Sequence, residues 1–273
     1  MSLPFAVSIA ALGLVQAALV ALPASRPPPE SLRRLRSRWW ALVPALSIVV
    51  VIASIELSSS SATALAYLAL IAVPPLAALA LGALLHGSRP FWAWAAVPLF
   101  ALAWASPGSL IGEAAATALT GLGCVSLGWL LVSAISAPWV RLGVYAMATI
   151  DAVYVSANLL QAPNALLTNA APVAELPRLQ AVHFGSAAMG FGDLFVAALV
   201  GCLLALPVDE TKSAPTARIS SRRQWVVAGL VAGLALGFDL LFLAVDTLPA
   251  TVPVAVALAL VQRDEARRFL GAA

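Results

Sequence analysis

Apolar runs of about twenty residues follow one another along most of this chain, separated by short polar connections. A helix needs about 20 apolar residues to cross the hydrocarbon layer of a membrane. Hydrophobic residues make up 62% of the chain and charged residues only 10%, which is typical of a polytopic membrane protein and not of a soluble domain. We therefore predict an all-α transmembrane helical bundle, with residues 1–273 forming one integral membrane domain.

The apolar runs predict nine spans, with the N-terminus outside and the C-terminus in the cytoplasm. The predicted spans cover about 3–22, 39–57, 62–85, 91–105, 110–135, 139–160, 182–206, 225–245 and 248–261. With this count, fourteen of the fifteen lysines and arginines fall on the inner side, and only Arg178 lies outside. Because basic residues accumulate in cytoplasmic loops, this distribution supports the count and predicts insertion in the cytoplasmic membrane. The first span is expected to be retained, since its basic residues follow the apolar run and a cleavable signal peptide has them before it.

Two carboxylates lie inside the predicted spans, where an ionised group is costly. Asp151 is about ten residues into the sixth span, and Asp193 is about eleven residues into the seventh. Placing a charged side chain at mid-membrane costs roughly 2.5–3.5 kcal/mol on insertion scales, so such residues are functional candidates. Since the sixth and seventh spans are antiparallel neighbours, we expect the two acids to face each other at similar depth. Two adjacent carboxyl groups cannot both ionise at low cost, and the pair is expected to share one proton.

A pair of aspartates that shares a proton can hydrolyse a peptide bond. The ionised member removes a proton from water, while the protonated member polarises the carbonyl group and later helps the amine to leave. Gly190 and Gly192 lie beside the second acid. Because glycine has no side chain, a substrate backbone can approach closely there.

The stretch Gly190-Phe191-Gly192-Asp193 resembles the motif of the GxGD intramembrane aspartyl proteases, the presenilin and signal peptide peptidase family. By this resemblance, Asp151 and Asp193 are the catalytic pair. Pro249 and Ala250 correspond to the first two residues of the family's Pro-Ala-Leu turn, which supports the substrate cleft. The resemblance implies a presenilin-like bundle of nine spans that cleaves transmembrane helices without a cofactor.

The predicted orientation resembles that of signal peptide peptidase, whereas presenilin is inverted. It implies substrates whose N-termini lie in the cytoplasm, such as remnant signal peptides, and a role in regulated intramembrane proteolysis. Two positions depart from the family pattern: Ile150 stands where a tyrosine precedes the first aspartate, and Thr251 replaces the leucine of the turn. These departures indicate a distant, prokaryotic-type member, and they leave open a homologue with weak or no activity.

Two alternatives share the same acids. Proton- or ion-coupled transporters use intramembrane acids as relays, and Asp239 and Glu113 would then matter beside the pair. Without such a role, Asp239 is expected near the outer interface, hydrogen-bonded to a neighbouring helix. Prepilin-peptidase-like aspartyl proteases also carry a GxGD motif, but basic and polar residues follow their aspartates. Here apolar residues follow both acids, as Ala152 and Leu194 illustrate.

Several other patterns predict structure instead of chemistry. Gly229, Gly233 and Gly237 recur every four residues in the eighth span and predict a face for close helix packing. His183 is expected at the membrane interface, at the end of a helix. The chain contains no HExxH motif, so no metal site is predicted. Topology and anionic lipid account for the basic loops, so no nucleic-acid partner is expected.

Overall fold

The computed structural model describes residues 4–28, 59–157, 176–206, 215–239 and 248–270, together with the single positions 30, 32, 46 and 50. The predicted second span, 39–57, therefore lies almost wholly outside the described residues. The described chain is mostly helical, with one short β-hairpin. In chain order its elements are α1 (Phe5–Ala21), α4 (Ser59–Leu79), the π-helix η2 (Ala80–Leu84), the 3-10 helix η3 (Pro90–Ala95), α5 (Ala96–Ala105), α6 (Leu110–Ala134), α7 (Ala137–Ser156), β1 (Ala181–Phe184), β2 (Ala187–Gly190), α9 (Phe191–Ala205), α10 (Pro215–Asp239) and α11 (Thr251–Leu270).

The start of α6 illustrates how local sequence sets the helix ends. Gly108, just before α6, has a φ of 71°, which favours glycine. The side chain of Ser109 then accepts a hydrogen bond from the backbone N–H of Gly112 at 3.1 Å. This cap satisfies one of the donors that a helix start leaves free. The helix predicted over 110–135 is confirmed here, and it ends at Ala134.

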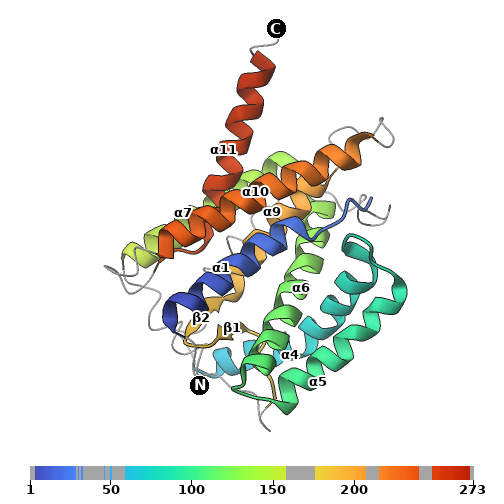
Figure 1. Cartoon of the computed structure of the whole chain (residues 1–273), viewed down its shortest axis with the longest axis vertical. Coiled ribbons are helices and arrows are strands. Elements are labelled where there is room, and N and C mark those ends of the chain that lie inside the picture. The colour runs from blue at the N-terminus through green and yellow to red at the C-terminus, as the bar shows by residue number, and fades with distance from the viewer. Residues whose placement is uncertain are drawn as a thin grey trace.

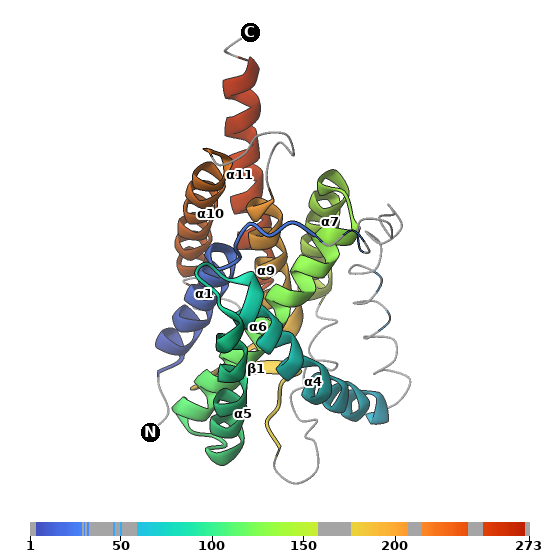
Figure 2. The same cartoon turned by 90° about the vertical axis from the view of Figure 1, so that its right-hand side faces the viewer.

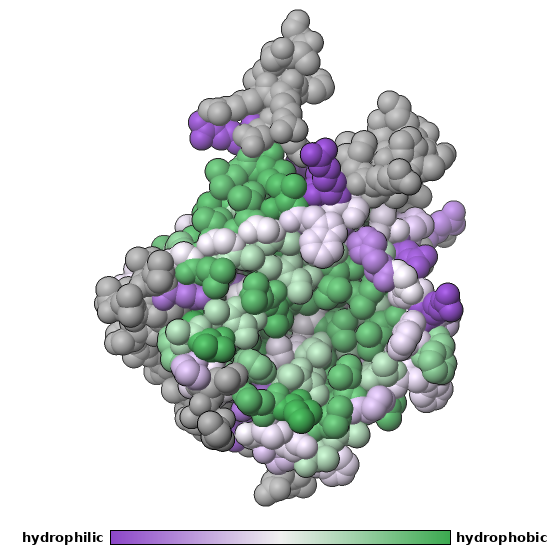
Figure 3. All heavy atoms as spheres, viewed as in Figure 1, coloured by the Kyte–Doolittle hydropathy of each residue, from purple (hydrophilic) through white to green (hydrophobic). Residues whose placement is uncertain are grey.

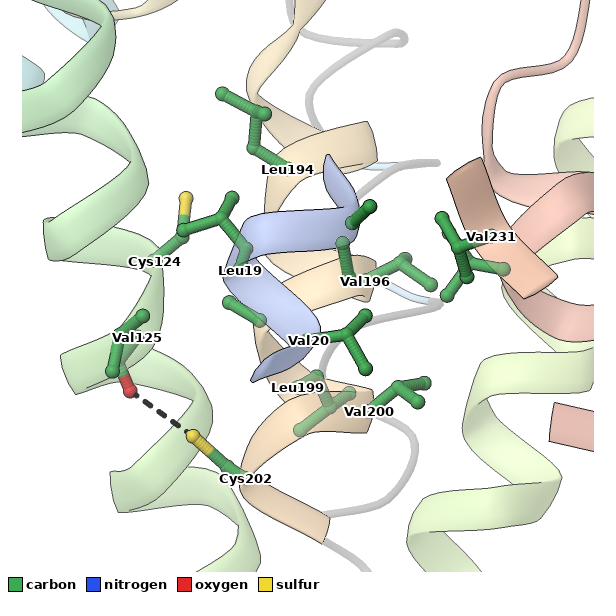
Figure 4. Packing of buried hydrophobic residues seen from close by; sticks show 14 of the residues in the cluster. Leu19, Val20, Cys124, Val125, Leu194, Val196, Leu199, Val200, Cys202 and Val231 are labelled. Carbon is green, nitrogen blue, oxygen red and sulfur yellow. Dashed lines mark hydrogen bonds between the residues drawn. The ribbon is translucent and has the colours of Figure 1, made fainter. Parts of the chain in front are cut away.

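The central helix of the bundle is α9, which contacts α1, α6, α7, α10 and α11. Figure 4 shows Leu19 and Val20 of α1 packed among buried residues of α6 and α9. At the crossing with α1, a side chain at Gly201 would place its Cβ 2.6 Å from the carbonyl oxygen of Leu19. Glycine is therefore required at this crossing, because a larger residue would push the two helices apart.

The remaining helices pack around this centre. In Figure 1, α1 and α10 lie side by side on the face nearest the viewer, and the two helices are in contact. On the other side of the bundle, α4 and α5 pack against α6. The start of α11 lies among α7, α9 and α10, and the helix then projects away from the bundle (Figures 1 and 2). The N-terminus and the C-terminus lie at opposite ends of the molecule in both views.

One end of the bundle joins the last residues of α1 and η2 to α10. The backbone N–H of Ala24 donates to the carbonyl oxygen of Leu84 at 2.7 Å. Gln224 of α10 is buried, and its Nε2 donates to the carbonyl oxygen of Pro23 at 2.7 Å. Arg26 follows directly in the chain, so this end corresponds to the predicted basic, inner side.

The opposite end carries the hairpin of β1 and β2, and here the prediction of one continuous helix over 182–206 is wrong. The two strands pair antiparallel, with Val182 opposite Met189, and α9 begins only at Phe191. The turn between the strands contains Gly185, whose φ is 62°. Asp193 consequently lies in the first turn of α9 and not in the middle of a span.

Contacts from two other helices hold the tip of the hairpin. The backbone N–H of Gly185 donates to Oε2 of Glu113 in α6 at 2.7 Å. The next N–H, from Ser186, donates to Oγ of Ser8 in α1 at 3.2 Å. These contacts supply the partners that a short hairpin lacks when it is isolated. Since the partners lie far away in the chain, the apolar run alone could not reveal them.

The predicted packing face of α10 is also wrong. Gly229, Gly233 and Gly237 are exposed, and a Cβ at any of them would meet nothing within 4 Å. The close approach to α1 occurs instead at Ala235, whose Cβ lies 3.0 Å from the Cβ position of Gly13. A small residue of α10, Ala235, does allow close packing, but it lies on a different side of the helix from the three glycines.

The last two predicted spans differ from the observed helices in their bounds. The helix α10 begins at Pro215, inside the segment 207–224 that was predicted as a loop. The helix α11 begins at Thr251 and extends to Leu270, past the predicted end at 261. At its start, the N–H of Val252 donates to the carbonyl oxygen of Pro249 at 3.2 Å.

Two described helices, Ser61–Leu84 and Leu110–Ala134, are long and apolar enough to cross a membrane. The shorter apolar helices are Phe5–Ala21, Pro90–Ala105, Phe191–Ala205 and Thr251–Arg263. Large apolar side chains also point outward: Ile71, Phe91 and Trp94 are 73%, 74% and 72% exposed. Figure 3 shows that apolar residues cover the middle of one face, while the most hydrophilic ones lie mainly along its margins. The described residues thus form a mostly helical chain with two candidate spans.

Candidate active site

Asp193 occupies the third position of α9, directly after the hairpin. The strand β2 ends at Gly190, whose extended backbone leads into the helix. The N–H of Gly190 donates to Oδ2 of Asp193 at 3.1 Å, which orients the carboxyl group across the helix start. The positive end of the helix dipole favours an acidic group at this position. The local sequence therefore places the acid at the rim of the bundle's central helix, where its side chain is half-buried.

Asp151 approaches from α7 and is held by the start of α11. The hydroxyl group of Thr251 donates to Oδ2 of Asp151 at 2.5 Å, and the N–H of Thr251 donates to the same oxygen at 3.4 Å. The helices α7, α9 and α11 contact one another, and both acids approach the start of α11: Asp151 through Thr251, and Asp193 through Gln16, which also donates to the carbonyl oxygen of Ala250. The structure thus brings the two predicted acids into one site.

Thr251 stands where the resembling family has leucine, and the sequence alone suggested only a tolerated change. In the structure its side chain is 3% exposed and makes the shortest polar contact with Asp151. The residue therefore belongs to the candidate site. The pairing joins positions 100 residues apart, so no local pattern indicated it.

Gln16 of α1 is a second site residue that sequence reasoning missed. Its side chain is 1% exposed, and its Nε2 donates to the carbonyl oxygen of Asp193 at 3.3 Å and to that of Ala250 at 3.2 Å. One amide group thereby ties the first turn of α9 to the start of α11. The available signal was an amide side chain inside the predicted first span, because a buried polar group in such a span needs partners.

The remaining predicted site residues surround Asp193. Phe191 begins α9, and its carbonyl oxygen lies 4.0 Å from Sγ of Cys124. A Cβ at Gly192 would meet nothing within 4 Å, so the space in front of it is open. Ala250 is half-buried, and Pro249 closes the turn before α11.

A cavity of about 270 Å³ opens beside Asp193. Its walls come from α1, β2, α9, α10 and the start of α11, and its lining residues are Phe5, Ile9, Gly13, Gln16, Ala188, Met189, Gly190, Asp193, Ala235, Phe238, Asp239, Leu248, Ala250 and Pro253. Most of these residues are apolar, but two are acids. A largely apolar cavity with a few convergent polar groups is the usual form of a small binding site.

The surroundings of Asp239 differ from those that the sequence predicted. Its Oδ2 is buried, and within the described part of the chain this oxygen has no hydrogen-bond partner. The expectation that a neighbouring helix satisfies the carboxylate is therefore wrong for this oxygen. Glu113, the other acid of the transporter alternative, is engaged with the hairpin turn through Gly185.

His183 lies on β1, outside the helices, and not at a helix end as predicted. Burial lowers the pKa of His183; the charge of Arg178 acts in the same direction and that of Glu113 opposes it. A neutral imidazole is the expected form near neutral pH. His183 does not line the cavity beside Asp193.

No group of three or more His, Cys, Asp or Glu side chains that could hold a metal ion occurs among the described residues. Both cysteines, Cys124 and Cys202, are buried and free. The chemistry available at the site is therefore that of two carboxyl groups, one hydroxyl group and one amide.

Compared with known proteins, the chain matches no family model, no curated protein and no solved structure. The resemblance to GxGD proteases rests on the motif residues of the sequence alone.

Proposed function

We propose that this chain is an intramembrane aspartyl protease that hydrolyses peptide bonds within transmembrane helices. One observation carries the proposal: Asp151 and Asp193 approach the same turn at Ala250–Thr251 from different helices, and Asp193 and Ala250 line a largely apolar cavity. A pair of carboxyl groups in a poorly hydrated site is suited to general acid–base hydrolysis. The GxGD resemblance of the sequence is consistent with this chemistry.

The hydrogen bonds suggest a role for each acid. Two donors of Thr251 point at one oxygen of Asp151, and hydrogen bonds from donors favour the charged form of a carboxylate. Asp151 would therefore act as the base that takes a proton from the attacking water. Asp193 would carry the shared proton, polarise the scissile carbonyl group and protonate the departing amine.

Access of the substrate follows from the hairpin. Peptide bonds in a helix are shielded by their own hydrogen bonds, so a substrate helix must locally unwind before hydrolysis. An unwound segment could lie beside the extended residues 187–190, of which Ala188 and Gly190 are exposed. The open space at Gly192 would then admit the substrate backbone next to Asp193.

The proposal includes nine spans, with the N-terminus outside and the C-terminus in the cytoplasm. Two features support an odd number of spans: the chain ends lie at opposite ends of the molecule (Figure 1), and the hairpin contacts Ser8 near the start of α1, whereas Arg26 follows the other end of that helix. By resemblance to signal peptide peptidase, the substrates would have cytoplasmic N-termini, as remnant signal peptides do. The site would work in the cytoplasmic membrane without a cofactor.

The test is cleavage of a panel of single-span peptides by the purified chain in lipid nanodiscs. We expect cleavage by the wild type, and a loss of at least about 100-fold in Asp193→Ala and in Asp151→Ala, because each removes one partner of the acid–base pair. Gly233→Ala, on the exposed face of α10, serves as the matched control that keeps activity. Cleavage that persists in both aspartate variants would rule out the pair as the catalyst.

A transporter is the second candidate, and one observation favours it: Asp193 and Asp239 line the same cavity. A relay of this kind would move protons or ions without hydrolysing peptides. Flux of protons into proteoliposomes, measured with an internal pH dye, separates the two. Flux that depends on Asp239 with no peptide cleaved by any variant would favour the transporter.

A further inference from the structure

We propose that the cavity beside Asp193 is a specificity pocket in which Asp239 binds a basic side chain of the helix to be cleaved. This proposal rests on the proposed function and names the substrate feature that the same site would select. The ligand is a lysine or arginine side chain that lies close to the scissile bond.

The unpaired oxygen of Asp239 is the first support. Oδ2 of Asp239 is buried, and no donor from the described residues reaches it. A buried carboxylate oxygen without a donor is unfavourable, so a ligand that brings a donor gains more there than at a solvated acid. The same side chain lines the cavity, so a molecule in the cavity can reach it.

The rest of the lining selects the type of donor. No lysine, arginine or histidine is present among the described residues that line the cavity, and the donor group of Gln16 is already bound to two carbonyl oxygens. Phe238 and Leu248 line the cavity together with Asp239 and supply apolar walls. A long side chain with an apolar stem and a cationic head matches both properties.

The size of the cavity and the number of its acids argue against smaller ligands. About 270 Å³ is far more than the roughly 30 Å³ that one water molecule takes up in the liquid. A metal ion would need more ligands, and no group of three acids, cysteines or histidines occurs in the described part of the chain. A lysine or arginine side chain fits within this space and needs only one carboxylate.

The position of the pocket relates the bound residue to the reaction. Asp193 and Asp239 line one cavity, on α9 and α10, so a basic residue held by Asp239 lies near the peptide bond whose carbonyl group Asp193 would polarise. Asp239 itself touches no reacting atom in this scheme and is a specificity residue. Its removal should therefore change the choice of substrate and not the hydrolysis of an apolar one.

The experiment uses the full chain in nanodiscs and a series of single-span peptides that differ at one residue. Lysine and methionine, which have similar length, are compared at each of several positions around the cleaved bond. We expect one position where the wild type cleaves the lysine peptide about 10-fold faster or more, as befits a hydrogen bond to a charged group. Asp239→Asn should bring this ratio to about one, while the methionine peptide is cleaved within about threefold of the wild-type rate.

Asp239→Glu is the matched variant, because it keeps the charge, and it should keep the preference for lysine. Unchanged cleavage of the methionine peptide by Asp239→Asn also shows that this variant is folded. A lysine preference that survives in Asp239→Asn, or no preference at any position in the wild type, would overturn the pocket.

A binding measurement separates this proposal from the proposed function. If no version cleaves any peptide, the affinities of labelled lysine and methionine peptides for the wild type and for Asp239→Asn are compared by fluorescence anisotropy. Tighter binding of the lysine peptide that is lost in Asp239→Asn would support the pocket and count against proteolysis. Equal binding of both peptides by the wild type would overturn the pocket as well.

Discussion

The two parts of α9 differ in how closely they are packed. From Leu194 onward the helix is almost completely buried, and a Cβ at Gly128 of α6 would lie only 3.1 Å from the Cα of Leu199. The first turn is open: Gly190 is exposed, and a Cβ at Gly192 would have no neighbour within 4 Å. One helix therefore combines a rigid, close-packed body with an accessible start. Asp193 lies where the two meet, so its position is fixed while its carboxyl group stays reachable.

The largest effect on stability is expected from a methyl group added in the packed part of α9. The same change in the open first turn provides the comparison. Gly201→Ala would place a Cβ within 2.6 Å of the α1 backbone, so we expect a loss of about 1–3 kcal/mol or more in the free energy of unfolding. Gly192→Ala meets nothing and should change it by less than about 1 kcal/mol. Chemical unfolding in mixed micelles measures both.

Cleavage assays of the same two variants sharpen this comparison. Gly192→Ala should lower peptide cleavage despite its unchanged stability, because the methyl group narrows the approach to Asp193. Equal losses of stability in the two variants would show that the first turn is packed like the rest of α9.

The next effect concerns the hydroxyl group that Thr251 presents to Asp151. Thr251→Val keeps the shape of the side chain but removes the donor, so we expect cleavage to slow by about 10- to 100-fold. Thr251→Ser keeps the donor and should retain most of the rate. The turnover rate on one peptide under saturating conditions gives the comparison. Full activity in Thr251→Val would mean that the contact with Asp151 has no catalytic role.

Two buried glutamines allow the open and the packed regions to be compared directly. Gln16 joins carbonyl oxygens at the candidate site, and Gln224 joins the carbonyl oxygens of Pro23 and Gly201 at the other end of the bundle. Replacement of either by leucine removes two or more hydrogen bonds from a buried polar region and should cost about 1–3 kcal/mol of stability.

Of the two variants, only Gln16→Leu should also slow cleavage, by a few-fold to about 10-fold. The reason is that Gln16, unlike Gln224, links the first turn of α9 to the start of α11. Thermal unfolding and cleavage of both variants under identical conditions provide the measurement. A similar slowing in Gln224→Leu would show that the effect follows general stability and not the position of the site.

The smallest effect is expected on the exposed glycines of α10. Gly233→Ala meets no neighbour, so the free energy of unfolding should stay within about 1 kcal/mol of the wild type, and cleavage should not change. A loss clearly greater than this, seen in chemical unfolding, would show that the glycine face packs against another surface in the membrane.

Part of the candidate site could be found from the sequence. Asp151 and Asp193 were recognisable because an acid inside an apolar run is rare, and the glycines around the second acid added the motif. The hairpin could not be found, since residues 182–190 adjoin an apolar run and the partners that hold the turn, Glu113 and Ser8, lie far away in the chain. Thr251 was noted only as a departure from a family pattern, although it makes the contact with Asp151.

The sequence by itself determined that most of this chain is helical, where many of the helices begin and end, and which two acids are candidates. These properties depend on local composition, because the transfer of apolar side chains out of water and the capping of helix ends act over a few residues. Only the tertiary structure decided which face of α10 packs, that α9 starts at Phe191, and that Gln16 links Asp193 to Ala250. The reason is distance along the chain: Gln16 and Ala250 are 234 positions apart, and a hydrogen bond of that kind exists only after the helices have assembled.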